Sequence, residues 1–417
     1  MIEKKINQND LIYKNNNPDK KLFFFAKDNF WIKNFFTTAS SNFLNNFELH
    51  DEATVIKLLK KKGFVCLGKT DLDEFACGGS GLLSKNGILV NPHNDKHIAG
   101  GSSSGSSVSV AQGLADFALG SDTGGSVRCP AAYCGVVGFK PSYGLISRYG
   151  LIPLSSSLDT VGILAKNVSI AKGIFSTINQ KDSHDLLTVT HKEIKKANFN
   201  SSKKIAVIDG LDEHLESNLR DLYNKKLNFL EKRGYTIKKV KLPKEIRDNL
   251  QITYLIISCS ELLSHLNSLQ GVTYGSKKEP ISIKENRTKH LGKEIKKRLL
   301  MGAYFLENPD CLKIARKLRS LTNDWVKKVF TKNEFLLFPS MNGPAPKIEQ
   351  VTSAFAGSEI VHWSDNLLLL ANFAGIPSLS LPIGLVEDLP VSININSGYG
   401  KDKEVLELAE KLEKKSD

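Results

Sequence analysis

Residues 97–142 are rich in glycine and serine, and they constrain the fold of this chain more than any other stretch. Two Gly-Gly-Ser turns occur here, at 100–102 and 124–126. Between them we predict a short helix of small residues at 106–112 and a buried strand at 117–119. A flexible Gly/Ser linker would not be interleaved with apolar elements in this way. The stretch is therefore predicted to be an ordered part of the core.

The second turn has the features of an anion-binding loop. Pro130 is expected at a helix start and Gly135 at its end, which predicts Ser126 between a strand and a helix N-terminus. Successive backbone N–H groups of residues 123–126 would form a nest for an anionic oxygen, and a hydroxyl beside such a nest indicates acyl transfer. The main alternative is a phosphate-binding loop. It is disfavoured because no Gly-Lys-Ser/Thr follows at P-loop spacing and no GxGxxG opens a helix.

Two lysines near the N-terminus need separate interpretations. Lys69 lies in a Gly-Lys-Thr sequence, but residues 64–67 before it are strand-like, so it does not end a P-loop. Lys27 follows the apolar run 23–26 and is predicted to end a strand. At an exposed strand end it would be an ordinary surface charge, whereas in an apolar pocket its pKa would fall and it could act as a base.

Composition and charge narrow the class of protein. No apolar run reaches the roughly 18 residues that a membrane span requires, and Glu3, Asp10 and Asp19 are atypical of an organellar transit peptide. We therefore expect a cytoplasmic protein, with the mitochondrial matrix as the alternative. The net charge of +13 is compatible with an RNA partner, although most basic residues lie beside acidic ones, as on a solvated surface. The six cysteines form no CxxC, which predicts reduced thiols and no zinc site.

Strands and helices alternate along the rest of the chain. Strands are predicted at 203–208, 235–242, 335–338 and 378–381, the last two ended by proline, and helices at 54–62, 216–233, 255–269 and 311–330. This alternation predicts an α/β architecture with a large central sheet.

Taken together, these motifs resemble the signature of the amidase signature family. The resemblance lies in residues 100–106, Gly-Gly-Ser-Ser-Ser-Gly-Ser, and in residues 122–128, Asp-Thr-Gly-Gly-Ser-Val-Arg. It implies a Ser–cis-Ser–Lys triad with Ser126 as nucleophile, Ser102 as bridging serine and Lys27 as base.

The same resemblance assigns the groups around the triad. Thr123, Gly124 and Gly125 would form the oxyanion hole. Arg298 would bind the α-carboxylate of free glutamine and Asp365 its α-amino group. No metal or other cofactor is implied for this chain.

Further motifs resemble the branch of the family that supplies glutamine-hydrolysing subunits to tRNA-dependent amidotransferases. They are residues 68–76, 147–151, 156–159, 297–302 and 372–377. The implied architecture is one amidase domain over 1–417, with a poorly defined segment at 1–20 and a charged, exposed lobe at 272–300. Its fold class would be α/β, the amidase signature fold, with a large central mixed β-sheet covered by helices on both sides.

The function implied by this branch is hydrolysis of glutamine through an acyl-serine. The ammonia would pass to a B subunit that uses ATP and Mg²⁺ to convert Glu-tRNA(Gln) to Gln-tRNA(Gln), and Asp-tRNA(Asn) is left open as a second substrate. A small C-type subunit would complete a heterotrimeric ligase of protein biosynthesis, and charged tRNA would be bound mainly by the partner. Two alternatives remain: a stand-alone amidase acting on small or fatty amides, and a non-catalytic scaffold subunit. The chain departs from the family in its short segment before Lys27 and in residues 81–84, Gly-Leu-Leu-Ser, where the family has Thr-Glu-Asn-Ser.

Overall fold

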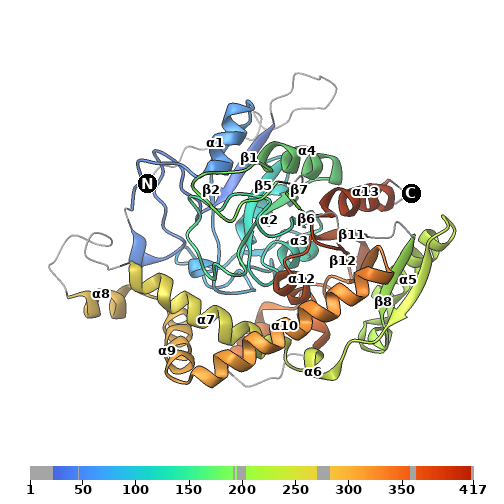
Figure 1. The fold of residues 1–417 in the computed structure, drawn as a ribbon. Coiled ribbons are helices and arrows are strands. Elements are labelled where there is room, and N and C mark those ends of the chain that lie inside the picture. The colour runs from blue at the N-terminus through green and yellow to red at the C-terminus, as the bar shows by residue number, and fades with distance from the viewer. Residues whose placement is uncertain are drawn as a thin grey trace.

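The computed structural model describes residues 22–45, 47–190, 193–194, 203–269, 282–356 and 363–414. Within these ranges the chain forms a ten-stranded sheet and a small two-stranded one (Figure 1). The order in the large sheet is β2 (Val65–Thr70), β1 (Phe23–Lys27), β5 (Phe117–Asp122), β7 (Thr160–Ala165), β6 (Val137–Lys140), β11 (Ser378–Val386), β12 (Leu389–Ser397), β10 (Phe335–Pro339), β8 (Lys204–Ile208) and β9 (Thr236–Val240). The small sheet pairs β3 (Val90–Asn91) with β4 (Asn94–Ile98).

The large sheet is mixed. At one edge β1 runs parallel to β2 and β5, and at the other β8 runs parallel to β9 and β10. The central pairs, from β5–β7 to β12–β10, are antiparallel. The expected class, an α/β fold with a large mixed sheet, is confirmed.

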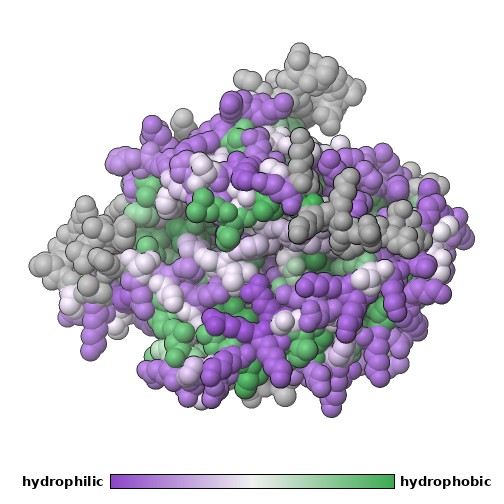
Figure 2. Space-filling model, in the orientation of Figure 1, coloured by the Kyte–Doolittle hydropathy of each residue, from purple (hydrophilic) through white to green (hydrophobic). Residues whose placement is uncertain are grey.

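The helices of the described ranges flank this sheet. They are α1 (Thr54–Lys61), α2 (Ser104–Ala111), α3 (Arg128–Cys134), α4 (Val168–Ile178), α5 (Ser217–Glu231), α6 (Lys244–Arg247), α7 (Leu250–Ser268), α8 (Ile283–His290), α9 (Lys293–Glu307), α10 (Pro309–Lys332), α11 (Ile348–Ala356), α12 (Leu369–Ala374) and α13 (Asp402–Glu413). In Figure 1, α7, α9 and α10 form a layer across the lower part of the molecule. On the face shown in Figure 2, hydrophilic residues predominate and hydrophobic residues form separate patches.

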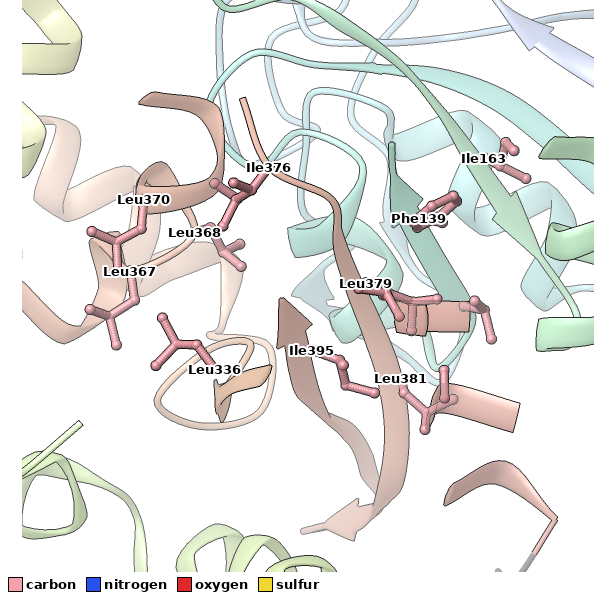
Figure 3. Close-up of a cluster of buried hydrophobic side chains, with 14 of the residues drawn as sticks. Phe139, Ile163, Leu336, Leu367, Leu368, Leu370, Ile376, Leu379, Leu381 and Ile395 are labelled. Carbon is pink, nitrogen blue, oxygen red and sulfur yellow. The ribbon is translucent and has the colours of Figure 1, made fainter. Parts of the chain in front are cut away.

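Side chains of successive residues in the central strands pack into two different hydrophobic clusters, one on each face of the sheet. Phe117 and Ile163 belong to the main hydrophobic cluster, which includes the buried residues of α4. Their neighbours Ala118 and Leu164 instead pack with Ala131 of α3. Since successive strand residues point to opposite faces, α4 and α3 cover opposite sides of the sheet. Figure 3 shows part of the main cluster, with side chains from β6, β7, β10, β11 and β12 and from residues 367–376.

Most predicted elements are present, and two details differ. The helix after the second Gly-Gly-Ser turn begins at Arg128, two residues before Pro130, and ends as predicted at Gly135, whose φ of 72° is left-handed. The strand predicted to end at Pro382 continues as β11 to Val386. This is possible because the β11–β12 register shifts between Pro382 and Gly384, while β6 pairs with β11 only up to Ser380.

The structure describes the predicted lobe 272–300 only in part and the N-terminal segment 1–20 not at all. Residues 1–20 lie outside the described ranges, as do residues 272–281 of the predicted lobe. From residue 282 onward this lobe forms α8 and the first part of α9, where Ile295 is buried. The single-domain assignment stays a prediction. Throughout the described ranges, no helix combines the length and apolar character needed to cross a membrane.

Candidate active site

Lys27 ends β1 inside the protein, with no exposed surface. Its ammonium nitrogen Nζ lies 2.7 Å from Ser102 Oγ, 2.9 Å from Ser121 Oγ and 3.0 Å from Ser103 Oγ. Burial lowers the pKa of Lys27 from 10.5 to about 7, and nearby carboxylates such as Asp73 offset this only in part. The interpretation of Lys27 as a surface charge is therefore wrong, and a large share of this amine is neutral near pH 7.

Ser102 lies on the first Gly-Gly-Ser turn, after a cis peptide bond from Gly101. A side chain on Gly101 could not be accommodated, because an ideal Cβ would lie 2.1 Å from Asp73 Oδ2. The two Gly-Gly-Ser turns meet here, since the N–H of Ser103 donates to the carbonyl oxygen of Ser126 at 3.1 Å. Residues far apart in sequence are thus joined into one site.

Ser126 occupies the predicted turn between β5 and α3 and is 8% exposed. Its hydroxyl makes no hydrogen bond to any residue that the structure describes. Gly125 before it has a φ of 119°, a conformation that favours glycine. The Ser126 hydroxyl is therefore held on a tight turn and is not hydrogen-bonded to another described residue.

The buried carboxylate of Asp122 fixes this turn through hydrogen bonds. Asp122 accepts hydrogen bonds from the N–H groups of Gly125 (2.9 Å) and Val127 (3.1 Å) and from the side chain of Asn372 (2.9 Å). Its carboxylate also pairs with the guanidinium of Arg128 at 2.9 and 3.0 Å. Burial would raise the pKa of Asp122, but Arg128, Asn372 and Lys140 together outweigh this and hold that pKa well below its usual range. The charged carboxylate of Asp122 therefore fixes the turn that carries Ser126.

The three residues expected in the oxyanion hole are not equivalent. The N–H of Gly125 already donates to Asp122, so it could reach an oxyanion only by sharing its hydrogen. The N–H groups of Thr123 and Gly124 make no hydrogen bond within the described part of the chain. The hydroxyl of Thr123 donates to Asp159 Oδ1 at 2.6 Å, which fixes the start of the loop.

Arg298 lies on α9. Its side chain is mostly buried, and Nε donates to Glu294 Oε1 at 2.8 Å. It interacts electrostatically with Tyr254, whose ring packs so closely on Gly124 that an ideal Cβ there would lie 2.9 Å from it. Asp365 lies in the short 3₁₀ helix Trp363–Asn366, and its side chain is outside the described part of the structure.

Several groups around Lys27 were not identified from the sequence. Ser121 receives hydrogen bonds from Lys27 Nζ and from Asn29 Nδ2, and Ser103 lies on the other side of the amine. The available signal was a serine directly after the apolar part of strand β5 and before Asp122. Among the described residues, no cluster of three or more His, Cys, Asp or Glu side chains could hold a metal.

This arrangement has the parts needed for acyl transfer. It combines a largely neutral buried amine, a hydroxyl in contact with it, a second hydroxyl on an adjoining turn and uncommitted backbone N–H groups. The family model for amidases matches residues 12–406, nearly the whole chain. The chain belongs to the amidase family.

Individual relatives sharpen this assignment. The amidase is 37% identical over 411 residues to the A subunit of the glutamyl-tRNA(Gln) amidotransferase from Pseudothermotoga lettingae, covering 96% of this chain and 87% of that protein. It is similar to the crystal structure of the corresponding protein from Thermotoga maritima, with a TM-score of 0.78 and 32% identity over 97% of this chain and 86% of that one. It also resembles the peptide amidase of Stenotrophomonas maltophilia, with a TM-score of 0.76 and 26% identity, covering 95% and 82%.

Proposed function

We propose that this amidase is the glutamine-hydrolysing A subunit of a glutamyl-tRNA(Gln) amidotransferase. The observation that carries the chemistry is the buried, largely neutral Lys27 amine 2.7 Å from Ser102 Oγ. The choice of substrate is supported by similarity to amidotransferase A subunits along nearly the whole chain. The mostly buried guanidinium of Arg298, which interacts electrostatically with Tyr254, suits an amino-acid substrate with a carboxylate.

In the proposed reaction Ser126 Oγ attacks the side-chain amide carbon of glutamine. Its proton passes to Ser102 Oγ while Ser102 gives its own proton to neutral Lys27. The N–H groups of Thr123 and Gly124 stabilise the tetrahedral oxyanion, and losing one such donor typically costs about 3 kcal/mol. The relay then returns a proton to the leaving nitrogen, which departs as ammonia. Water hydrolyses the remaining γ-glutamyl ester of Ser126 and releases glutamate.

The proposal extends to the complex. Ammonia would pass to a B subunit that uses ATP and Mg²⁺ to convert Glu-tRNA(Gln) to Gln-tRNA(Gln). A small C-type subunit would complete a heterotrimer, and the partner would make most contacts with tRNA. This chain itself would need no cofactor. These roles are supported by the similarity to amidotransferase A subunits and by the branch-specific motifs of the sequence.

The decisive test is the Ser126→Ala variant, assayed for ammonia release from glutamine in the purified complex. We expect activity to be abolished while the subunits still co-purify. Activity within tenfold of wild type would remove Ser126 from the reaction, and unchanged amidation of tRNA in cells would favour the scaffold alternative.

The stand-alone amidase alternative gains support from the likeness to a peptide amidase. It predicts turnover of hydrophobic amides by the isolated chain and none of glutamine. Assaying both substrates side by side separates the two proposals.

A further inference from the structure

A cavity lies between α7, α10 and the loop that follows β6. Its volume is about 560 Å³, within the range of small-molecule sites. Glu261 of α7, Arg316 and Arg319 of α10, and Ser157 of the loop contribute to its wall. Neither the lysine nor the serines of the active site line it. The two helices pack side by side (Figure 1).

The cavity contains two guanidinium groups and one carboxylate, that of Glu261, which interacts electrostatically with Arg319. Arg316 makes no ion pair or hydrogen bond with any residue that the structure describes. Arg319 donates only to neutral oxygens, those of Ser157 at 2.9 Å and of Phe373 at 3.3 Å. Glu261 accepts two hydrogen bonds through Oε2, including that from the N–H of Ser157 at 3.0 Å, whereas its Oε1 accepts none within the described ranges. The exposed guanidinium of Arg316 and Glu261 Oε1 are thus open to a ligand, and Arg319 adds a positive charge whose hydrogen bonds all end on neutral oxygens.

We propose that this cavity is a second binding site, for an acidic α-amino acid. Such a ligand carries two carboxylates, which match Arg316 and Arg319, and one ammonium, which matches Glu261 Oε1. Carboxylates bind guanidinium groups through paired, charge-assisted hydrogen bonds. A neutral amino acid would leave one arginine without a partner, and a dicarboxylate would leave the glutamate without one.

A chain of hydrogen bonds links the wall of this cavity to the residues that hold the oxyanion loop. Glu261 also accepts the hydroxyl of Ser155 at 2.7 Å. The N–H groups of Ser155 and Leu154 donate to the buried Asp159, at 3.0 and 2.9 Å. Asp159 in turn holds the hydroxyl of Thr123 at 2.6 Å. A ligand that draws Glu261 or Arg319 away from this loop would therefore loosen the start of the oxyanion hole.

The effect on catalysis rests on the proposed function, whereas the binding itself does not. If the chain hydrolyses glutamine, its product glutamate is an acidic α-amino acid. The second site would then sense accumulated product without occupying the active site.

Isothermal titration of the full-length protein with L-glutamate tests the binding. In the Arg298→Ala variant, which removes the active-site contact, we expect one remaining site. Arg316→Ala should weaken that site at least tenfold, and Lys313→Ala, an exposed change on the same helix, should not. If Arg298→Ala does not fold, the loss of one glutamate site per chain caused by Arg316→Ala in the otherwise wild-type chain supports the same conclusion. Unchanged glutamate binding in Arg316→Ala overturns the inference.

Ligand analogues test the class of ligand. Succinate lacks the ammonium and L-alanine lacks the second carboxylate, so each should bind at least tenfold more weakly than L-glutamate. Equal binding of succinate or of inorganic phosphate would show a general anion site and overturn the assignment.

A kinetic measurement tests the link to the oxyanion loop. With a small uncharged amide as substrate, added glutamate should lower kcat in the wild type but change only KM in Arg316→Ala. Loss of this difference overturns the coupling. The proposed function is judged separately by Ser126→Ala.

Discussion

Two lysines are completely buried in the central sheet, Lys27 at the end of β1 and Lys140 at the end of β6, and their surroundings differ. Burial lowers the pKa of both from 10.5 to about 7. The Lys27 amine faces the hydroxyls of three serines. The Lys140 amine instead donates to the backbone carbonyl of Pro141 at 2.9 Å.

The comparison shows that a depressed pKa does not by itself identify a catalytic base. The guanidinium of Arg128 further lowers the pKa of Lys140, while Asp122 and Asp402 oppose that shift. Within the described part of the chain Lys140 makes no hydrogen bond to a hydroxyl, so it lacks the proton route that Lys27 has. Lys27 has such a route through Ser102. Geometry, and not the pKa alone, separates the two roles.

The largest expected effect is on activity when the amine of Lys27 is removed. Lys27→Met should lower ammonia release from glutamine by about 10²–10⁴-fold, the usual contribution of general acid–base catalysis. Lys27→Arg should be equally inactive, because a guanidinium does not deprotonate at accessible pH. Circular dichroism should confirm folding of both. An active arginine variant would mean that charge, and not proton transfer, is required.

A smaller effect is expected from the substrate contacts. Arg298→Ala and Asp365→Ala should each reduce kcat/KM for glutamine by roughly ten- to a hundredfold, because a charge-assisted contact contributes about 1.5–3 kcal/mol. Turnover of a small uncharged amide should change little, since the Lys27 cluster is intact. Equal loss with both substrates would show that these residues support the fold instead.

The pH dependence should report the pKa of Lys27. Protonation of its amine blocks the relay, so kcat/KM for glutamine should fall about tenfold per unit as the pH drops below about 7. Steady-state kinetics between pH 5.5 and about 9 would measure this. The Lys140→Met variant should keep the same profile, and a profile displaced by that substitution would contradict the division of roles.

The smallest effect on activity is expected from Lys140→Met, which should stay within about threefold of wild type. Its consequence should appear in stability. Because the folded pKa lies below the unfolded value of 10.5, the unfolded chain binds more protons between pH 7 and 10.5, and the free energy of unfolding rises with pH in that window. Removing Lys140 should reduce this slope by at most about 1.4 kcal/mol per pH unit. Denaturant titrations at several pH values check it, and an unchanged slope would mean that the pKa of Lys140 is not depressed.

Much of the site could be anticipated because its parts are local patterns. The two Gly-Gly-Ser turns, the strand before Ser126 and the helix stop at Gly135 each follow from neighbouring residues and backbone sterics. The misjudged strand end at Pro382 shows the limit of such patterns. Whether a proline interrupts a strand depends on which side of it is paired, and that is a property of the sheet.

The sequence by itself determined the α/β alternation, the two serine turns and the lysine at a strand end. Only the tertiary structure decided that Lys27 is buried against Ser102, that the N–H of Gly125 donates to Asp122 and that Tyr254, which interacts with Arg298, packs on Gly124. The physical reason is that turn and strand preferences arise between adjacent residues. Burial, pKa shifts and hydrogen-bond partners are set instead by groups that folding brings together from distant parts of the chain.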